Sequence, residues 1–326
     1  MATPPTLASR GPVVSRIGLG CMAMSGVYGA TDDAASIRTI HAAIDAGIKL
    51  LDTGDFYGSG HNELLVGRAI AGHRDRVVLS VKFGALRGPD GGFIGVDTRP
   101  AAVKNFAAYS LRRLGVDVID LYRPARLDPQ VPIEETIGAV ADLVKAGYVR
   151  QIGLSEVGVD TIRRAHAVHP IADLQIEYSI ASRGPEARVF PALAELGIGA
   201  TVYGVFSRGL LTGTKPAGGD FRARFPRFSS EHAAQNAAMV EAFARFAKQR
   251  EMTAGQLAVA WVLAKQPAWM PLAGAKTEAQ LRDAIGALDR PLAAADVAAL
   301  EQLVPPGAFA GDRYSADQMR HLDSER

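Results

Sequence analysis

Cysteine is almost missing from this chain of 326 residues, which contains a single one, Cys21. One cysteine excludes a disulfide framework and a metal centre built from several thiolates, and it favours a reducing compartment. Long hydrophobic runs are missing too, since no stretch reaches the length that a membrane span needs. Residues 1–16 contain prolines and polar residues in place of the apolar centre of a signal sequence. We therefore expect a cytoplasmic protein that does not bind membranes.

Charge of one sign is also lacking. The 36 lysines and arginines stand against 34 acidic residues, for a net charge of +2, and no basic stripe interrupted by aromatics is present. A nucleic-acid partner is therefore not expected. With 48% hydrophobic and 21% charged residues, the composition is that of a globular protein able to bury a large core. The length would allow two domains, but closed α/β barrels of this size are commonly single domains.

Short, β-rich apolar segments alternate with longer amphipathic segments along almost the whole chain. This alternation is typical of βα units that form a parallel sheet. The expected strands are residues 17–20, 48–53, 77–83, 118–122, 149–155, 173–178, 200–205 and 269–274. The predicted helices between them include residues 33–46, 99–114, 133–146, 159–168 and 186–196, several of which end in glycine.

The first turn distinguishes a closed barrel from an open, doubly wound sheet. The segment Gly18-Leu19-Gly20-Cys21-Met22 contains no G-x-G-x-x-G that leads directly into a helix, which excludes a Rossmann fingerprint. We therefore predict a single-domain (β/α)8 TIM barrel over residues 1–310. A long loop at residues 212–231 follows the seventh strand and either caps a pocket or forms a mobile surface insertion. An extra helix is expected at residues 293–303, and residues 311–326 are expected to form a poorly ordered polar tail.

In a barrel, chemistry takes place at the carboxyl ends of the strands. The second strand ends in Asp52, which Asp55 and Tyr57 follow, and the third delivers Lys82 in an otherwise apolar segment. A buried, unpaired ammonium is costly, so we expect Lys82 to pair with Asp52 on the adjacent strand. Bringing the pKa of a tyrosine from near 10 to about 7 takes about 4 kcal/mol, much of which a nearby cation supplies. Each residue alone also fits a structural role, but together they indicate an acid–base site.

The sequence resembles the aldo-keto reductases over nearly its whole length, from residue 16 to the last barrel helix. The segments that carry the resemblance are Asp52-Thr53-Gly54-Asp55-Phe56-Tyr57-Gly58, Glu63-Leu64-Leu65-Val66-Gly67-Arg68-Ala69, Lys82, Ile152-Gly153-Leu154-Ser155, Gln175-Ile176-Glu177-Tyr178-Ser179, Tyr203 with Ser207-Arg208-Gly209-Leu210-Leu211-Thr212-Gly213, and Gly274-Ala275-Lys276. The resemblance implies a (β/α)8 barrel that binds NADPH without a Rossmann domain and transfers a hydride to an aldehyde or ketone.

The resemblance also implies roles for individual residues. Tyr57 would protonate the carbonyl oxygen, Lys82 would lower the pKa of Tyr57, and Asp52 would hold Lys82. The residues implied for cofactor binding are Asp52, Ser155, Gln175, Tyr203, Gly204, Ser207, Arg208, Gly209, Leu210, Gly274, Lys276 and Gln280. Among them, Ser155 and Gln175 would bind the nicotinamide carboxamide, Tyr203 would stack on its ring, and the backbone of residues 207–210 would cradle the pyrophosphate. Asp55 is expected to contact the cofactor ribose or its own loop.

The chain departs from the family pattern after the fourth strand. Relatives carry a histidine there, in Leu-Tyr-x-x-His-Arg-x-Asp, where this chain has Ala125. The histidine helps to orient the carbonyl, so its loss leaves room for a water, a larger substrate or a neighbouring polar side chain. Arg123 is one candidate replacement, and a surface-pointing arginine is the alternative. The residues expected at the substrate pocket are Phe56, Arg123, Ala125 and Met22. The alanine occurs in a subgroup with pyridoxal-reductase-like members, which points to a vitamin B6 aldehyde.

Further departures concern the cofactor. Glu156 stands where many relatives have asparagine, and Ala275 and Ala284 replace the usual Ser/Thr and Asn near the adenosine 2′-phosphate. Lys276 can still meet that phosphate as a point charge. NADPH is therefore expected, with NADH as the alternative.

These features favour an NADP-dependent reductase of a small-molecule carbonyl compound, without a metal; self-association is left open. The missing histidine favours an alternative, a cofactor-binding redox sensor or partner subunit with little turnover. A third hypothesis is a barrel lyase or aldolase that uses Lys82 as a Schiff-base nucleophile. Asp52 beside it would raise the lysine pKa, which argues against this third hypothesis.

Overall fold

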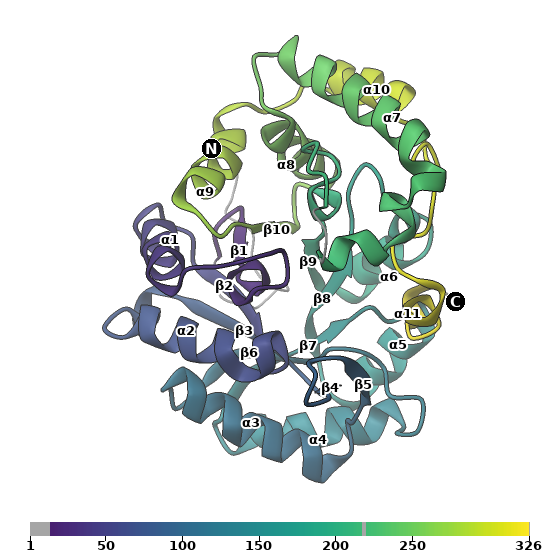
Figure 1. Cartoon of the computed structure of the whole chain (residues 1–326). Helices are drawn as coiled ribbons and strands as arrows, with labels where there is room; N and C mark the ends of the chain where they lie inside the picture. The colour runs from purple at the N-terminus through teal and green to yellow at the C-terminus, as the bar shows by residue number, and fades with distance from the viewer. Residues whose placement is uncertain (1–13, 217–219, 326) are drawn as a thin grey trace.

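The computed structural model describes residues 14–216 and 220–325. Eight parallel strands close into a barrel in the order β1-β10-β9-β8-β7-β6-β3-β2, with β1 paired to both β10 and β2 (Figure 1). The barrel strands are β1 (Gly18–Gly20), β2 (Leu50–Gly54), β3 (Val78–Phe83), β6 (Ile119–Pro124), β7 (Val149–Ser155), β8 (Ile171–Glu177), β9 (Gly199–Tyr203) and β10 (Met270–Gly274). Each expected strand overlaps one of these, and the predicted (β/α)8 barrel is confirmed.

Helices surround the barrel (Figure 1) and bury their apolar stripes against the sheet or against one another. They are α1 (Asp33–Asp45), α2 (His61–Ile70), α3 (Pro100–Leu114), α4 (Ile133–Lys145), α5 (Val159–Val168), α6 (Val189–Leu196), α7 (Ser230–Lys248), α8 (Ala254–Lys265), α9 (Glu278–Ile285) and α10 (Ala294–Leu303). Gly115 and Gly197 end α3 and α6 in the left-handed conformation, at φ 66° and 65°. The extra helix predicted at residues 293–303 is α10.

The interior of the barrel changes from apolar to polar along the strands. Inward-facing residues alternate with outward-facing ones, so each strand contributes every second side chain to the interior. Leu50, Val78 and Leu121 belong to one buried apolar cluster. Two residues further along the same strands, the buried side chains are Asp52, Ser80 and Arg123. Polar groups therefore collect at the carboxyl end of the barrel.

Two connections at this end carry structure of their own. A hairpin that the sequence did not predict, β4 (Ala85–Arg87) with β5 (Phe93–Val96), follows β3. The long loop after β9 contains the 3-10 helices η5 (Ser207–Gly209), η6 (Phe221–Arg224) and η7 (Pro226–Phe228), while its residues 217–219 lie outside the described residues. Phe225 and Arg227 of this loop are buried, so the described part of it packs onto the protein.

The C-terminal segment is the clearest departure from expectation. Residues 311–325 include α11 (Ala316–Met319), near the C-terminus in Figure 1, and η9 (Asp323–Glu325). The Asp323 carboxylate accepts a hydrogen bond of 2.8 Å from the Gly158 amide, and Arg313 is buried. The prediction of a poorly ordered tail is wrong, because its polar side chains bind the end of the barrel. Arg326 and residues 1–13, which the predictions included, lie outside the described residues.

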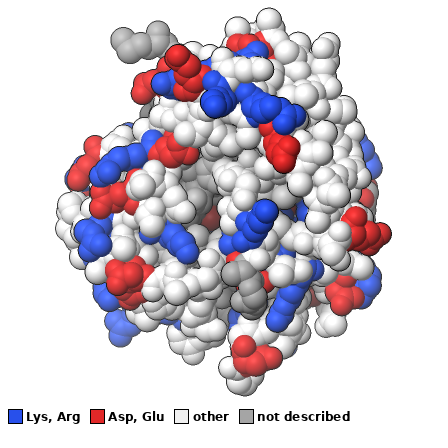
Figure 2. Space-filling view, turned by 45° about the horizontal axis from the view of Figure 1, so that its top comes forward, with Lys and Arg blue, Asp and Glu red and all other residues white. Residues whose placement is uncertain are grey.

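The surface matches the balanced charge of the sequence. On the face in Figure 2, lysine and arginine side chains alternate with acidic ones around a central hollow. Among the described residues, none of the helices combines the length and the apolar character that crossing a membrane demands.

Candidate active site

Asp52, Lys82 and Tyr57 come together at the mouth of the barrel. Asp52 on β2 and Lys82 on β3 form a buried ion pair, as the sequence predicts. The Lys82 Nζ lies 5.1 Å from the centroid of the Tyr57 ring, which the 3-10 helix η2 (Tyr57–Gly60) holds above the end of β2. Tyr57 is 7% exposed, and its hydroxyl makes no hydrogen bond with any residue that the structure describes. The phenol is therefore free to bind a ligand.

The electrostatics of these residues differ from the family expectation. Burial raises the pKa of the Tyr57 phenol well above its ordinary value, and the charge of Asp52 raises it further. Burial also lowers the pKa of Lys82, more than the charge of Asp52 raises it. The resemblance implies that Lys82 lowers the pKa of Tyr57, whereas in this structure the pKa of Tyr57 is raised. Asp52 raises the pKa of Lys82, as expected, but burial lowers it by more, so the net pKa lies below its ordinary value.

A network of buried polar side chains holds Asp52 in place. Its Oδ2 accepts hydrogen bonds from Ser80 Oγ at 2.8 Å and from Gln175 Nε2 at 2.7 Å. Below it, Arg123 pairs with Asp173 on β8 and donates to Ser80 Oγ at 3.0 Å. The network combines two buried ion pairs through shared hydrogen bonds, so it fixes the orientation of the Asp52 carboxylate that binds Lys82.

Arg123 corrects two expectations. It does not point to the surface, since its side chain is completely buried inside the barrel. It also does not replace the missing histidine, because its guanidinium is engaged by Asp173, Ser80 and Thr201 below the mouth. Gly153 on β7 makes room for it: a Cβ there would lie 3.3 Å from Arg123 Nε.

The other residues predicted for the substrate pocket lie around Tyr57. The Phe56 ring meets the Tyr57 ring edge-on, with centroids 4.7 Å apart. Ala125 is buried directly after β6. Its amide donates, at 2.8 Å, to the carbonyl of Phe83, the residue that follows Lys82. Met22, half-buried, begins the 3-10 helix η1 (Met22–Ser25) after β1. The place of the histidine is therefore occupied by a methyl group.

Two residues predicted to bind the nicotinamide carboxamide offer unused polar atoms. Ser155 is buried at the end of β7, and its Oγ has no hydrogen-bond partner among the described residues. Gln175 donates its Nε2 to Asp52 and Thr201, which leaves the carbonyl oxygen Oε1 as an acceptor. One hydroxyl and one amide oxygen are the groups that a carboxamide needs, because it both donates and accepts.

Glu156, which replaces the asparagine of relatives, is engaged by the C-terminal segment. Its carboxylate accepts from Arg313 Nη1 at 3.0 Å, from Ser324 Oγ at 2.7 Å and from Tyr203 Oη at 2.7 Å. Burial raises the pKa of Glu156, but the charges of Arg313 and Arg126 and the hydrogen bonds from Arg313 and Ser324 together outweigh burial and lower it to about 2. Tyr203, predicted to stack on the nicotinamide, is also 2.8 Å from the Tyr314 hydroxyl. The tail therefore lies against the predicted cofactor site.

The segment predicted to cradle the pyrophosphate has an unusual backbone. Ser207, Arg208 and Gly209 adopt φ angles of 47°, 56° and 92°, and Gly204 adopts 69°. Left-handed angles at non-glycine residues are strained and collect at functional sites. Leu210, also predicted, is buried and donates its amide to the Ser207 carbonyl at 3.1 Å. Arg208 pairs with Glu177 on β8 at 2.8 Å.

The residues predicted at the adenosine phosphate lie after β10. Gly274 ends the strand, and the Lys276 amide donates to Gln280 Oε1 on α9 at 3.0 Å. Lys276 Nζ contacts only the carbonyls of Tyr28 and Ala30 among the described residues, at 3.3 and 3.4 Å. Its charge has no acidic partner there, which fits a phosphate ligand.

Some residues of this site were missed from the sequence. Ser80, Asp173 and Thr201 each stand two positions before a predicted site residue on the same strand, so the alternation of inward positions would have found them. Arg313 and Tyr314 carry no local signal, since they are distant in sequence from the strands they contact.

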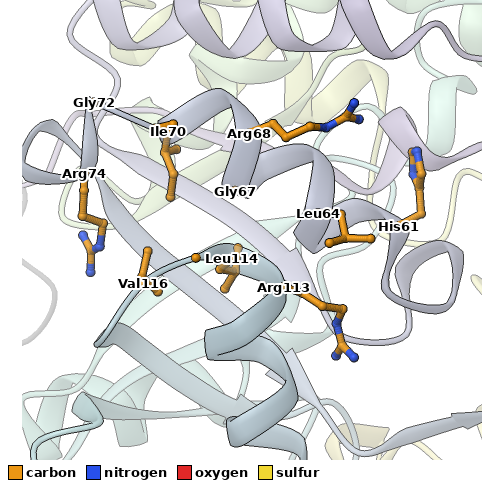
Figure 3. A pocket seen from close by; sticks show the side chains of 12 residues that line it. His61, Leu64, Gly67, Arg68, Ile70, Gly72, Arg74, Arg113, Leu114 and Val116 are labelled. Atoms are coloured by element: carbon orange, nitrogen blue, oxygen red, sulfur yellow. The ribbon is translucent and has the colours of Figure 1, made fainter.

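A separate hollow lies outside the barrel. It is a groove of about 580 Å³ between α2 and α3, lined by residues that include His61, Gly67 and Arg113 (Figure 3). None of the predicted site residues lines it, so it belongs to the packing of the helices.

The chain is similar to known proteins over most of its length. A family model described as the Aldo/keto reductase family matches residues 16–305. The chain is 39% identical over 320 residues to "Probable aldo-keto reductase 1" of Glycine max, covering 95% of this chain and 91% of that protein.

Solved structures are similar as well. The glycerol dehydrogenase of Gluconobacter oxydans aligns with a TM-score of 0.84 and 28% identity, over 99% of this chain and 98% of that one. An aldo-keto reductase of Klebsiella pneumoniae in complex with NADPH aligns with a TM-score of 0.75 and 26% identity, over 97% and 99%.

Proposed function

The chain belongs to the aldo/keto reductase family, and on this premise we propose that it reduces an aldehyde or ketone to the alcohol, with Tyr57 as the proton donor. It is an NADP-dependent oxidoreductase, as its family membership and its NADP-bound structural relatives indicate. One observation carries the proposal: a buried Asp52–Lys82 ion pair lies beside a tyrosine whose hydroxyl has no partner among the described residues.

The residues present fit NADPH, which supplies the hydride when bound. Ser155 Oγ and Gln175 Oε1 are available to the carboxamide. The strained turn at residues 207–209 lies where the pyrophosphate is expected, with the amides of Ser207 and Gly209 already bound to backbone carbonyls. Lys276 provides a charge for the 2′-phosphate. These contacts support NADPH as the cofactor.

The role of Tyr57 follows from its protonation. Because burial raises its pKa, the phenol carries its proton at neutral pH and can give it to the carbonyl oxygen as negative charge develops there. Lys82 stands beside the phenolate that remains, and Asp52 keeps Lys82 oriented. Tyr57 is then reprotonated from water.

The test is the oxidation of NADPH against a panel of aldehydes by the wild type and by Tyr57→Phe. We expect the variant to lose about 10²- to 10⁴-fold in kcat, the usual size of a general acid's contribution, with NADPH affinity retained. Lys104→Met, which removes an exposed lysine on α3, is the control and is expected to keep full activity. Unchanged turnover in Tyr57→Phe would contradict the assignment.

Ala125 is the observation that favours a second function, a redox-sensing or partner subunit. Tight NADPH binding without turnover on any carbonyl would support it. The Schiff-base hypothesis has a test of its own, because burial lowers the pKa of Lys82. Borohydride trapping of a carbonyl compound on Lys82 would support that hypothesis, and we expect no trapping, since Lys82 donates to Asp52.

A further inference from the structure

Two arginines beside Tyr57 form no ion pair among the described residues. Arg126 directly follows Ala125, and its Nη1 donates to the Ala125 carbonyl at 2.6 Å, while Nη2 lies 3.4 Å from the Tyr314 hydroxyl. Arg87, on the hairpin strand β4, donates only to the Gly91 carbonyl, at 3.2 Å. Neither forms an ion pair with any residue in 14–216 or 220–325.

The absence of an ion pair distinguishes these two side chains from several other arginines at this end of the barrel: Arg123 pairs with Asp173, Arg208 with Glu177, and Arg313 with Glu156. Arg126 is at least partly buried, and burial of a guanidinium without a directly bound counter-charge is unfavourable. Burial lowers the pKa of Arg126, and the surrounding groups Tyr314, Tyr203 and Glu156 raise it by more, but none of them forms an ion pair with it. An anionic ligand would bind the guanidinium directly.

Both guanidinium groups lie near the proposed proton donor. The Arg87 guanidinium carbon is 5.5 Å from the centroid of the Phe56 ring, and that ring packs against Tyr57. On the other side, Arg126 extends from the position of the missing histidine toward Tyr314, whose ring centroid is 5.8 Å away. Burial raises the pKa of Tyr57, and the charge of Arg126 opposes that rise, which agrees with their proximity.

We propose that the substrate is a carbonyl compound that also carries a carboxylate or phosphate group, held by Arg126 with Arg87 adding to the positive charge. This inference rests on the proposed reduction and names the substrate class of the same site. The planar guanidinium of Arg126 matches both anions and binds them through two parallel hydrogen bonds. Because Ala125 cannot hydrogen-bond the carbonyl, the second, anionic group would orient the substrate instead.

The experiment compares aldehydes that differ only in charge. The carboxylate arm measures kcat/KM for 4-carboxybenzaldehyde against its methyl ester, and the phosphate arm measures glyceraldehyde 3-phosphate against glyceraldehyde. In at least one arm we expect the wild type to prefer the anion by about 10- to 100-fold, the size of a charge-assisted hydrogen bond. The arm with the larger preference identifies the anion.

Variants connect this preference to the two arginines. In Arg126→Gln we expect the ratio of kcat/KM for the charged aldehyde to that for the neutral one to fall to about 1. In Arg126→Lys the ratio should fall only partly, because the positive charge stays but the paired donors of the planar guanidinium are lost. Arg87→Gln, at an exposed position, should lower the ratio less. The control is Arg163→Gln on α5, which pairs with Glu195 away from the site and should leave the ratio unchanged.

A wild-type ratio of 1 in both arms would overturn the inference, as would a preference that survives in both Arg126→Gln and Arg87→Gln. A protein that reduces no aldehyde contradicts the proposed function instead. In that case calorimetry on the NADP⁺-loaded protein still decides: 4-carboxybenzyl alcohol should bind at least 10-fold more tightly than benzyl alcohol. Equal affinities there would overturn the inference independently of turnover.

Discussion

Two carboxylates only three positions apart, Asp52 and Asp55, have different environments. Asp52 forms an ion pair with Lys82 and accepts hydrogen bonds from Ser80 and Gln175. Asp55 is buried and forms no ion pair with any described residue: its Oδ2 accepts from the Gly84 amide at 3.2 Å, and its Oδ1 has no hydrogen-bond partner among these residues. Burial raises the pKa of Asp55 from 3.8 to about 7, and the charge of Glu63 adds to this rise. Below pH 7, Asp55 therefore contacts its loop as a largely neutral carboxyl group.

Asp55→Asn should change the pH dependence of stability. The unfolded chain releases the Asp55 proton near pH 4 and the folded protein near pH 7, so between these values the folded state binds more protons and loses stability as pH rises. Asparagine cannot titrate. We expect the free energy of unfolding of the variant, relative to wild type, to increase by up to about 4 kcal/mol between pH 4 and pH 7.

Urea unfolding at pH 5 and pH 8 measures this difference. Asp45→Asn, at an exposed carboxylate on α1, is the control and should show a nearly constant difference. If the Asp55→Asn difference were also independent of pH, Asp55 would not titrate as its burial implies.

At the scale of an element, the C-terminal segment completes the mouth of the barrel. Arg313 binds Glu156 at the end of β7 and Glu177 on β8, and Glu325 binds the same guanidinium from within the segment. The Ser324 amide also donates to the Glu156 carbonyl at 3.2 Å. The segment is therefore held mainly by ionic contacts with two strand ends.

Glu156→Gln should loosen this segment. The amide keeps the size of the side chain but removes the charge that balances Arg313, with a loss of about 2 kcal/mol expected for a charged hydrogen bond. Hydrogen–deuterium exchange should become faster in residues 311–325 and stay unchanged in α3 and α4. Glu325→Gln, at a side chain that is 42% exposed, contacts the same arginine and should have a smaller effect. Equal effects of the two variants would show that Glu156 is not the main anchor.

At the scale of the whole molecule, the ring of helices depends on close approaches that only glycine permits. Gly67 on α2 faces the C-terminal end of α3 in the groove of Figure 3. A Cβ at this position would lie 2.7 Å from the Leu114 carbonyl oxygen and 2.8 Å from that of Arg113. Gly138, in the middle of α4, would place a Cβ in open space.

We expect substitution by alanine to have opposite effects on stability at these two helical glycines. Gly67→Ala should destabilise the protein by about 1–3 kcal/mol, as overpacking against backbone does. Gly138→Ala should stabilise it by up to about 1 kcal/mol, because alanine is the better helix former. Chemical denaturation of both variants is the measurement. The same sign for both would contradict the packing of α2 against α3.

Local periodicity in the sequence was enough to predict the architecture and one ion pair of this protein. Alternating strand and helix patterns predicted the eight-stranded barrel, because each βα unit buries its apolar face in only one way. The same patterns placed Asp52 and Lys82 on adjacent strands, and the cost of burying a lone ammonium predicted their pairing.

Contacts between residues that are far apart in the chain became known from the folded structure alone. Arg123 lies inside the barrel because Asp173 on another strand balances its charge and Gly153 leaves space for it. The C-terminal segment packs because Arg313 finds Glu156 and Glu177 at the barrel mouth. A charged residue in a sequence indicates a surface position until its partner is known, since only a buried counter-charge offsets the loss of hydration.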